Sequence, residues 1–187
     1  MAADELNEGE EVLPLDNLDR TIVSADALFS PWPDVDAIIG NPPYIGRRDM
    51  AGELGGGYTQ RLEDAYPNIG GVSDFVCYWF PKAHDHLPVG GRAGYVATAT
   101  IRENDSRKAS LDYIEDHGGI ITEAVSSQPW LGDAQVHVSI VNWIKPAENE
   151  EVPGPRVLWL KNGDLRLELN KYQPLSHPMS TSDQRGR

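Results

Sequence analysis

The tetrapeptide Asn41-Pro42-Pro43-Tyr44 carries the most distinctive chemistry in the sequence. The apolar run before it, which ends at Gly40, predicts a buried strand, and the two prolines predict that this strand stops at once. Proline also disfavours the helical region for the residue before it, so Asn41 is expected to be extended at the strand tip.

The strand tip is rich in hydrogen-bond acceptors and nearly free of donors. The Asn41 side chain and the Pro42 carbonyl can each accept a hydrogen bond, whereas neither proline has an N–H. The ring of Tyr44 adds a flat stacking surface, a contact worth about 1–3 kcal/mol per base in single-strand binders. These groups suit a planar NH₂ on a nucleobase or a carboxamide, and two acceptors would make the nitrogen lone pair available for attack.

Strands and helices are expected to alternate around this tip, which predicts an α/β sheet. The expected strands are residues 21–28, 34–40, 93–100, 120–126, 136–145 and 157–160. The expected helices are 58–66, a longer one from an N-cap at Ser73 to Leu87 with a kink at Pro81, and 110–117. A charged loop is expected at 102–108. Asp26 and Asn41 then end consecutive strands, at the edge where open α/β sheets bind ligands.

Several further segments share an order with a known family. They are Ala25-Asp26-Ala27-Leu28 upstream, Asp74-Phe75 at a helix start, Gly90-Gly91-Arg92 before a strand, and Gln128-Pro129-Trp130 before the strand from Val136. Together with Asn41–Tyr44, this set resembles the S-adenosylmethionine-dependent DNA adenine-N6 methyltransferases. Residues 37–145 are most similar to the methyltransferase part of single-chain type II restriction-modification enzymes.

The resemblance implies a fold and a set of site residues. The fold would be the Rossmann-like sheet of class I methyltransferases. The resemblance assigns catalysis to Asn41, Pro42, Pro43 and Tyr44. It assigns cofactor binding to Asp26, Ala27, Asp74 and Phe75. Trp130, Arg47, Arg48 and Arg102 would contact the substrate, with Arg107 and Lys108 as further phosphate contacts. The partner would be double-stranded DNA with one flipped adenine, methylated by direct in-line transfer.

The chain departs from the family at its start, because the glycine-rich cofactor loop after the first strand is absent. We therefore expect the C-terminal portion of a methyltransferase domain at 20–146, between an acidic linker at 1–19 and a polar, proline-rich extension at 147–187. A missing N-terminal part or a target-recognition domain would be supplied elsewhere. Two alternatives stay open: a protein glutamine-N5 methyltransferase, whose carboxamide substrate presents the same NH₂, and a non-catalytic fragment or DNA-binding remnant.

Several other features of the sequence bear on the remaining possibilities. The sequence has no transmembrane run or signal peptide, which predicts a soluble, cytoplasmic protein without membrane partners. Cys77 is the only cysteine and is expected to be a small buried hydrophobe. The segment His84-Asp85-His86 contains residue types that bind metals, but we expect it to form a solvated helix face without a metal. Trp130 suits either a core position or base stacking.

The charge balance is unusual for a protein that binds DNA. The chain has 29 acidic and 16 basic residues, a net charge of −13, and 11 arginines against 5 lysines. DNA binders are usually basic, because phosphate neutralisation supplies much of their affinity. An acidic, lysine-poor surface is instead typical of proteins from salt-loving organisms.

We therefore predict that salt stabilises this protein. Raising KCl from about 0.1 M to about 1 M shortens the Debye length from about 10 Å to about 3 Å and screens the self-repulsion. Thermal unfolding followed by circular dichroism should show a rising midpoint over this range. An unchanged midpoint would contradict the salt-adaptation hypothesis.

Overall fold

The computed structural model describes residues 22–70, 73–130, 137–152, 156–161 and 164–167. The chain divides into two compact units, residues 1–32 and 33–187, and each is described by itself. The predicted acidic linker at 1–19 lies outside the described residues.

The second unit is built on a six-stranded mixed sheet in the order β1-β2-β4-β3-β5-β6. The strands are β1 (Ala37–Gly40), β2 (Arg92–Thr98), β3 (Ile120–Pro129), β4 (His137–Ile144), β5 (Arg156–Lys161) and β6 (Asp164–Leu167). β1 runs parallel to β2 and β5 runs parallel to β3, whereas β4 is antiparallel to both of its neighbours. β5 and β6 fall in the segment predicted as a C-terminal extension and belong to this sheet. The α/β prediction is confirmed.

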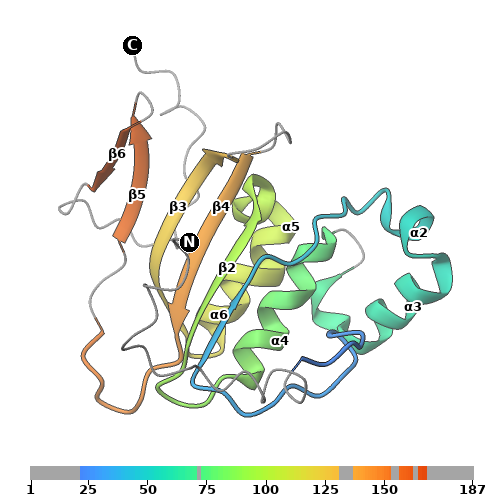
Figure 1. Cartoon of the computed structure of the whole chain (residues 1–187), viewed down its shortest axis with the longest axis horizontal. Helices are drawn as coiled ribbons and strands as arrows, with labels where there is room; N and C mark the ends of the chain where they lie inside the picture. The colour runs from blue at the N-terminus through green and yellow to red at the C-terminus, as the bar shows by residue number, and fades with distance from the viewer. Residues whose placement is uncertain (1–21, 71–72, 131–136, 153–155, 162–163, 168–187) are drawn as a thin grey trace, which may run out of the picture. The chain divides into compact units, whose positions relative to one another are not determined.

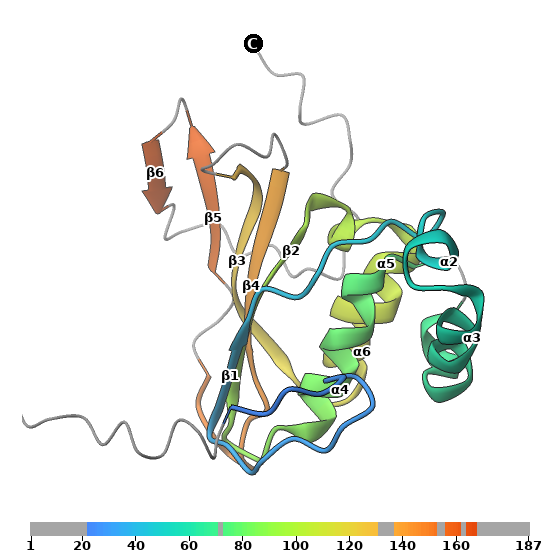
Figure 2. The same cartoon turned by 45° about the vertical axis from the view of Figure 1, so that its right-hand side comes forward.

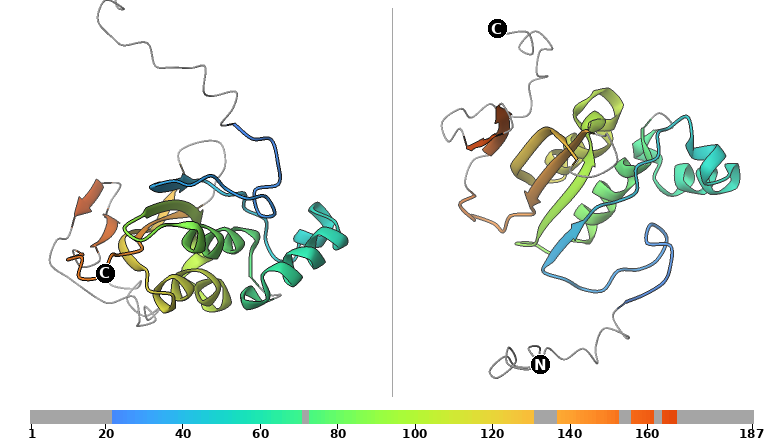
Figure 3. Two further views of the ribbon diagram at one scale, coloured as in Figure 1. Left: turned by 90° about the horizontal axis from the view of Figure 1, so that it is seen from below. Right: turned by 45° about the horizontal axis from the view of Figure 1, so that its top comes forward.

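Short helices fill the connections between the strands. They are α2 (Met50–Glu53), α3 (Gly56–Ala65), η2 (Pro67–Ile69), η3 (Phe75–Tyr78), α4 (Trp79–His86), η4 (Ala99–Arg102), α5 (Asn104–Arg107), η5 (Lys108–Asp112, a π-helix) and α6 (Tyr113–Asp116). α4, α5 and α6 lie along one face of the strands (Figures 1 and 2). In both views of Figure 3, α2 and α3 lie at the opposite end of this unit from β5 and β6. None of the described helices has the length and apolar content needed to cross a membrane.

The core lies between the sheet and these helices. Phe80 of α4 stacks on Trp143 of β4 with ring centroids 5.5 Å apart, and Tyr95 of β2 meets both rings edge-on. All three side chains are almost fully buried. Cys77 is buried as predicted, and burial raises the pKa of its thiol to about 12.

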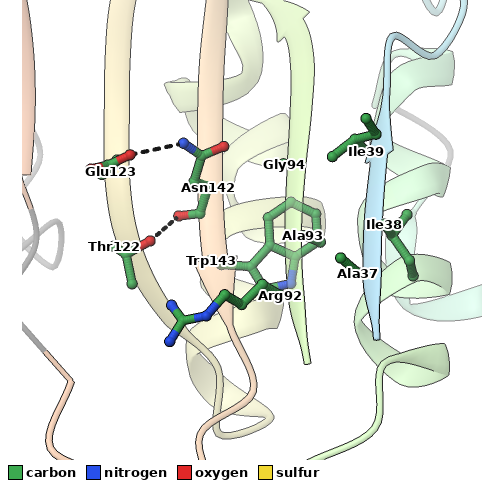
Figure 4. A pocket seen from close by; sticks show the side chains of 10 residues that line it. All are labelled: Ala37, Ile38, Ile39, Arg92, Ala93, Gly94, Thr122, Glu123, Asn142 and Trp143. Carbon is green, nitrogen blue, oxygen red and sulfur yellow. Dashed lines mark hydrogen bonds between the residues drawn. The ribbon is translucent and has the colours of Figure 1, made fainter. Parts of the chain in front are cut away.

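The opposite face of the sheet is open where β1, β2, β4 and β3 meet. In Figure 4, Ile39, Asn142 and Glu123 stand on the side away from the helices, around a shallow hollow. Ile39 is 88% exposed. Asn142 donates a hydrogen bond to Glu123 (3.1 Å), and a Cβ on Gly94 would lie 2.4 Å from the Asn142 oxygen.

Two predictions about the strands need correction. Residues 22–28 form no strand: a turn begins at Asp26, whose side chain accepts a hydrogen bond from the Leu28 N–H (3.1 Å) and whose carbonyl accepts from Phe29 and Ser30. Local bonding of this kind competes with strand pairing. β1 is not buried, because it is an edge strand of the sheet that the described residues form.

Three helix predictions also need correction. Ser73 is not an N-cap: its hydroxyl donates to the Ile69 carbonyl (3.1 Å). Pro81 does not kink the predicted helix, because a 3₁₀ turn gives way to α4 at Trp79, and Pro81 then falls in the first turn, where no N–H is needed. The expected loop at 102–108 is mostly helical, as η4 and α5.

His84 is buried rather than on a solvated face, which corrects a further prediction. It is 1% exposed, and its Nε2–H donates to the His117 carbonyl (3.2 Å). Its Nδ1 has no hydrogen-bond partner among the described residues, and burial lowers the pKa of the ring. Within the described ranges, no three His, Cys, Asp or Glu side chains are placed to share a metal ion.

The buried imidazole predicts a loss of stability in acid. The folded pKa of His84 lies below the usual 6.5, so the unfolded chain binds more protons as pH falls, and the free energy of unfolding decreases. In urea unfolding, His84→Gln should lose less stability between about pH 7 and about pH 5 than the wild type. His137→Gln, at an exposed position of β4, is the control and should follow the wild type. Equal losses in wild type and His84→Gln would contradict this account.

Gly40 gives a second prediction, because it packs directly on Tyr95. A Cβ at Gly40 would lie 2.9 Å from Cε1 of Tyr95, a ring that is 3% exposed and held by Phe80 and Trp143. Gly40→Ala should lower the free energy of unfolding by about 1–3 kcal/mol through overpacking. Gly52→Ala, which places its methyl in open space within α2, is the matched control. Equal stability of the two variants would contradict this prediction, because it would show that the Tyr95 ring moves to make room for the new methyl group.

Candidate active site

Three strands of the second unit end at one edge of the sheet, close to the predicted residues Asn41 and Trp130. Gly40 pairs with Tyr95, three residues before β2 ends at Thr98. Thr98 pairs with Val138 at the start of β4, next to the pair formed by Pro129 and His137. The segments after β1, β2 and β3 therefore leave the sheet at the same edge. This is the edge predicted for ligand binding.

The strand tip presents Asn41 to solvent. Asn41 is exposed, Pro42 is buried beneath it, and Tyr44 is half-buried. The Tyr44 hydroxyl donates a hydrogen bond to Oδ1 of Asn41, and burial raises the pKa of Tyr44, which keeps the hydroxyl protonated. An incoming amine would have to displace this hydroxyl to use the Asn41 acceptor.

Asp74 and Phe75 lie against the chain that leaves the tip. The Phe75 N–H donates to the Ile45 carbonyl (2.9 Å). Asp74 accepts a hydrogen bond from the Arg47 N–H on Oδ1 (3.0 Å) and one from the Thr100 hydroxyl on Oδ2 (3.0 Å). The structure therefore joins Asp74 to the tip segment and to the end of β2. The cofactor role of Asp74 and Phe75 stays a prediction.

The Phe75 side chain is part of a buried aromatic cluster. It is 5% exposed, and its ring centroid lies 6.3 Å from those of Tyr58 and Tyr78 and 6.5 Å from that of Trp79. This packing fixes the start of η3 in the core.

The arginines predicted to contact DNA differ in their surroundings. Nη2 of Arg47 forms an ion pair with Glu63 of α3 (2.9 Å), while Arg48 is exposed. Arg102, at the end of η4, lines a hollow together with an asparagine and with basic and acidic residues of α5, η5 and α6. These are Asn104, Arg107, Lys108, Asp112, Glu115 and Asp116. The mixed signs leave their phosphate contacts as predictions.

The structure says less about three other predicted site residues, Trp130, Asp26 and Ala27. Trp130 follows β3 at the same edge and is 41% exposed, so a fully buried core position is excluded. The residues after it, 131–136, lie outside the described part of the chain. Asp26 and Ala27 belong to the first unit, where the Ala27 carbonyl accepts a hydrogen bond from the Trp32 indole (2.8 Å).

Sequence reasoning missed three polar residues of this edge. The hydroxyls of Thr98 and Thr100 are hydrogen-bonded to each other (2.7 Å), and Thr100 continues to Asp74. Glu63 pairs with Arg47. The alternation of Thr98, Ala99 and Thr100 at the end of an apolar strand was an available signal, whereas no local pattern connects Glu63 with Arg47.

Two known proteins, a methyltransferase and a restriction-modification enzyme, are similar to this chain. M.XhoI, a type II methyltransferase of Xanthomonas vasicola, is 25% identical over 170 residues, which cover 85% of this chain and 29% of that protein. The solved structure of the type IIL restriction-modification enzyme MmeI in complex with DNA has a TM-score of 0.64 and 22% identity, over 79% of this chain and 21% of the enzyme.

A third protein has a similar fold at lower identity. It comes from Listeria monocytogenes, is proposed as a class I S-adenosylmethionine-dependent methyltransferase, and has a TM-score of 0.55 at 16% identity. The match covers 84% of this chain and 43% of that one. The chain thus spans less than a third of the length of M.XhoI and of MmeI, and under half of the Listeria protein.

A family model described as the DNA-methyltransferase domain of MmeI matches residues 1–153, most of the chain. The match includes the strand tip, the segment at Asp74 and the sheet edge. The chain belongs to the MmeI DNA-methyltransferase domain family.

Proposed function

We propose that this chain forms the target-amine side of a DNA adenine-N6 methyltransferase of a restriction-modification system. The observation that carries the proposal is the exposed Asn41 directly before two prolines and Tyr44, at the edge where three strands end. Membership of a DNA-methyltransferase domain family supports the proposal.

Asn41 and Tyr44 would bind and orient the substrate base. After the Tyr44 hydroxyl moves away, Oδ1 of Asn41 and the Pro42 carbonyl would accept the two N–H bonds of the adenine N6 amine. The Tyr44 ring would stack on the flipped base, with exposed Trp130 available at the same edge. The protein would contribute positioning and a preorganised pair of acceptors.

The cofactor proposed is S-adenosylmethionine, and the residues present fit one end of it. Asp26 carries a carboxylate at a turn, and one of its oxygens already accepts an N–H, so its remaining lone pairs suit an adenine amine or a ribose hydroxyl. Ala27 follows Asp26 in the sequence. When bound, the cofactor supplies an electrophilic methyl group. The sequence has no glycine-rich loop for the methionine end.

We also propose that a further polypeptide segment completes the catalytic domain. Among the described strands, β1 is at the edge of the sheet, its sequence Ala-Ile-Ile-Gly is apolar, and Ile39 is 88% exposed. An apolar edge strand with unpaired backbone groups is a site for strand addition. A missing N-terminal part that brings the glycine-rich loop would pair there, which agrees with the small share of M.XhoI and MmeI that this chain spans.

Glutamine-N5 methylation is the second candidate, because the Asn41 acceptors do not distinguish a carboxamide from a base amine. The family match and the predicted arginine contacts favour DNA. A non-catalytic remnant is the third, supported by the absent glycine-rich loop.

Asn41→Ala tests the proposal. It removes the exposed acceptor and should lower methyl transfer to duplex DNA by at least about a hundredfold, as for the loss of one preorganised electrostatic contact. The assay measures the incorporation of tritiated methyl groups into duplex DNA. The enzyme in the assay is the longest polypeptide encoded by the gene of this chain. Asn68→Ala, at another exposed asparagine, is the control and should retain activity. Full activity in Asn41→Ala would refute the assignment.

A further inference from the structure

Asp74 lies where three segments of the second unit meet. It precedes η3, yet its side chain makes no capping hydrogen bond to that helix. Its two carboxylate oxygens instead accept hydrogen bonds from Arg47 and Thr100, which are 27 and 26 residues away in the sequence. The side chain therefore serves long-range connections rather than its own helix.

One connection holds the chain that leaves the strand tip. The Arg47 N–H binds Oδ1 of Asp74 (3.0 Å), and the neighbouring Phe75 N–H binds the Ile45 carbonyl (2.9 Å). These two hydrogen bonds begin directly after Tyr44. They set the direction in which the Asn41–Tyr44 segment leaves β1.

The other connection holds the end of β2. The Thr100 hydroxyl binds Oδ2 of Asp74 (3.0 Å), and Thr98 shares a hydrogen bond with Thr100 (2.7 Å). Asp74 thus links the segments that follow two adjacent parallel strands. A carboxylate can hold both at once because its two oxygens accept separately.

The anchor of this link is rigid. Phe75, the next residue, is buried among Tyr58, Tyr78 and Trp79. A carboxylate at the start of a packed helix has a fixed position relative to the two segments that it binds.

We propose that Asp74 is a positioning residue that fixes the Asn41–Tyr44 tip against the end of β2. The proposal rests on the proposed function and reassigns Asp74 within it. We infer that Asp74 acts through Arg47 and Thr100, which its two oxygens already bind, and not as a direct cofactor ligand.

Amide hydrogen exchange on the 187-residue chain tests the link directly. Asp74→Ala removes both acceptors and should speed exchange of the Arg47 amide by about tenfold or more, the effect expected for a lost hydrogen bond to a charged group. Asp74→Asn should restore protection, because Oδ1 can accept from Arg47 while Nδ2 donates to Thr100. Thr100→Val removes only the second bond and should leave the Arg47 amide protected.

Asp64→Ala is the matched control. Asp64 is an exposed carboxylate on α3 that accepts a hydrogen bond from Gln60 (3.0 Å). This variant should leave Arg47 exchange unchanged, and amides of β2 and β4 should stay protected in every variant. Unchanged Arg47 exchange in Asp74→Ala, or equal exchange in Asp74→Ala and Asp74→Asn, would overturn the proposal.

Methyl-transfer kinetics separate this inference from the proposed function. Asp74→Ala should lower kcat about tenfold and leave the KM for S-adenosylmethionine within about threefold, whereas loss of a direct ligand would raise that KM. Asp74→Asn should recover kcat. A wild-type protein without methyl transfer would count against the proposed function, while the exchange experiment would still decide the role of Asp74.

Discussion

The parallel pairing of β1 with β2 is the contact on which the candidate site depends. It covers only four residues of β1, and Gly40 closes against the buried ring of Tyr95. This pairing brings the Asn41–Tyr44 segment and the Thr98–Thr100 segment to one edge. Without it, the acceptors of the tip would have no fixed relation to the rest of the sheet.

Around this pairing, the two faces of the sheet have different surroundings. The helix face is filled by aromatic rings of α4, β2 and β4, and it gives the second unit its core. On the other face, β1 leaves Ile39 exposed beside Gly94 and Asn142. The proposed function is consistent with this asymmetry, because one side of the site is built from this chain and the other would come from a further segment.

Sequence reasoning succeeded where local interactions alone determine the backbone conformation. Two prolines after an apolar strand define an extended tip whatever the tertiary context, and the sheet and α3 followed from the apolar pattern. Ser73, Pro81 and the 102–108 segment were assigned wrongly, because tertiary contacts selected 3₁₀ and helical turns there. Asp26 favoured its own turn over a strand. The bonds of Asp74 connect residues 26 and 27 positions apart, and no local pattern encodes them.

We propose that the tip binds a planar amine and that this amine is N6 of adenine. Transfer from S-adenosylmethionine carrying a ¹³C-labelled methyl group, followed by mass spectrometry of digested DNA and protein, identifies the acceptor atom. The account predicts the label on N6-methyladenine. Label on the side-chain nitrogen of glutamine, or on N4 of cytosine, would contradict it.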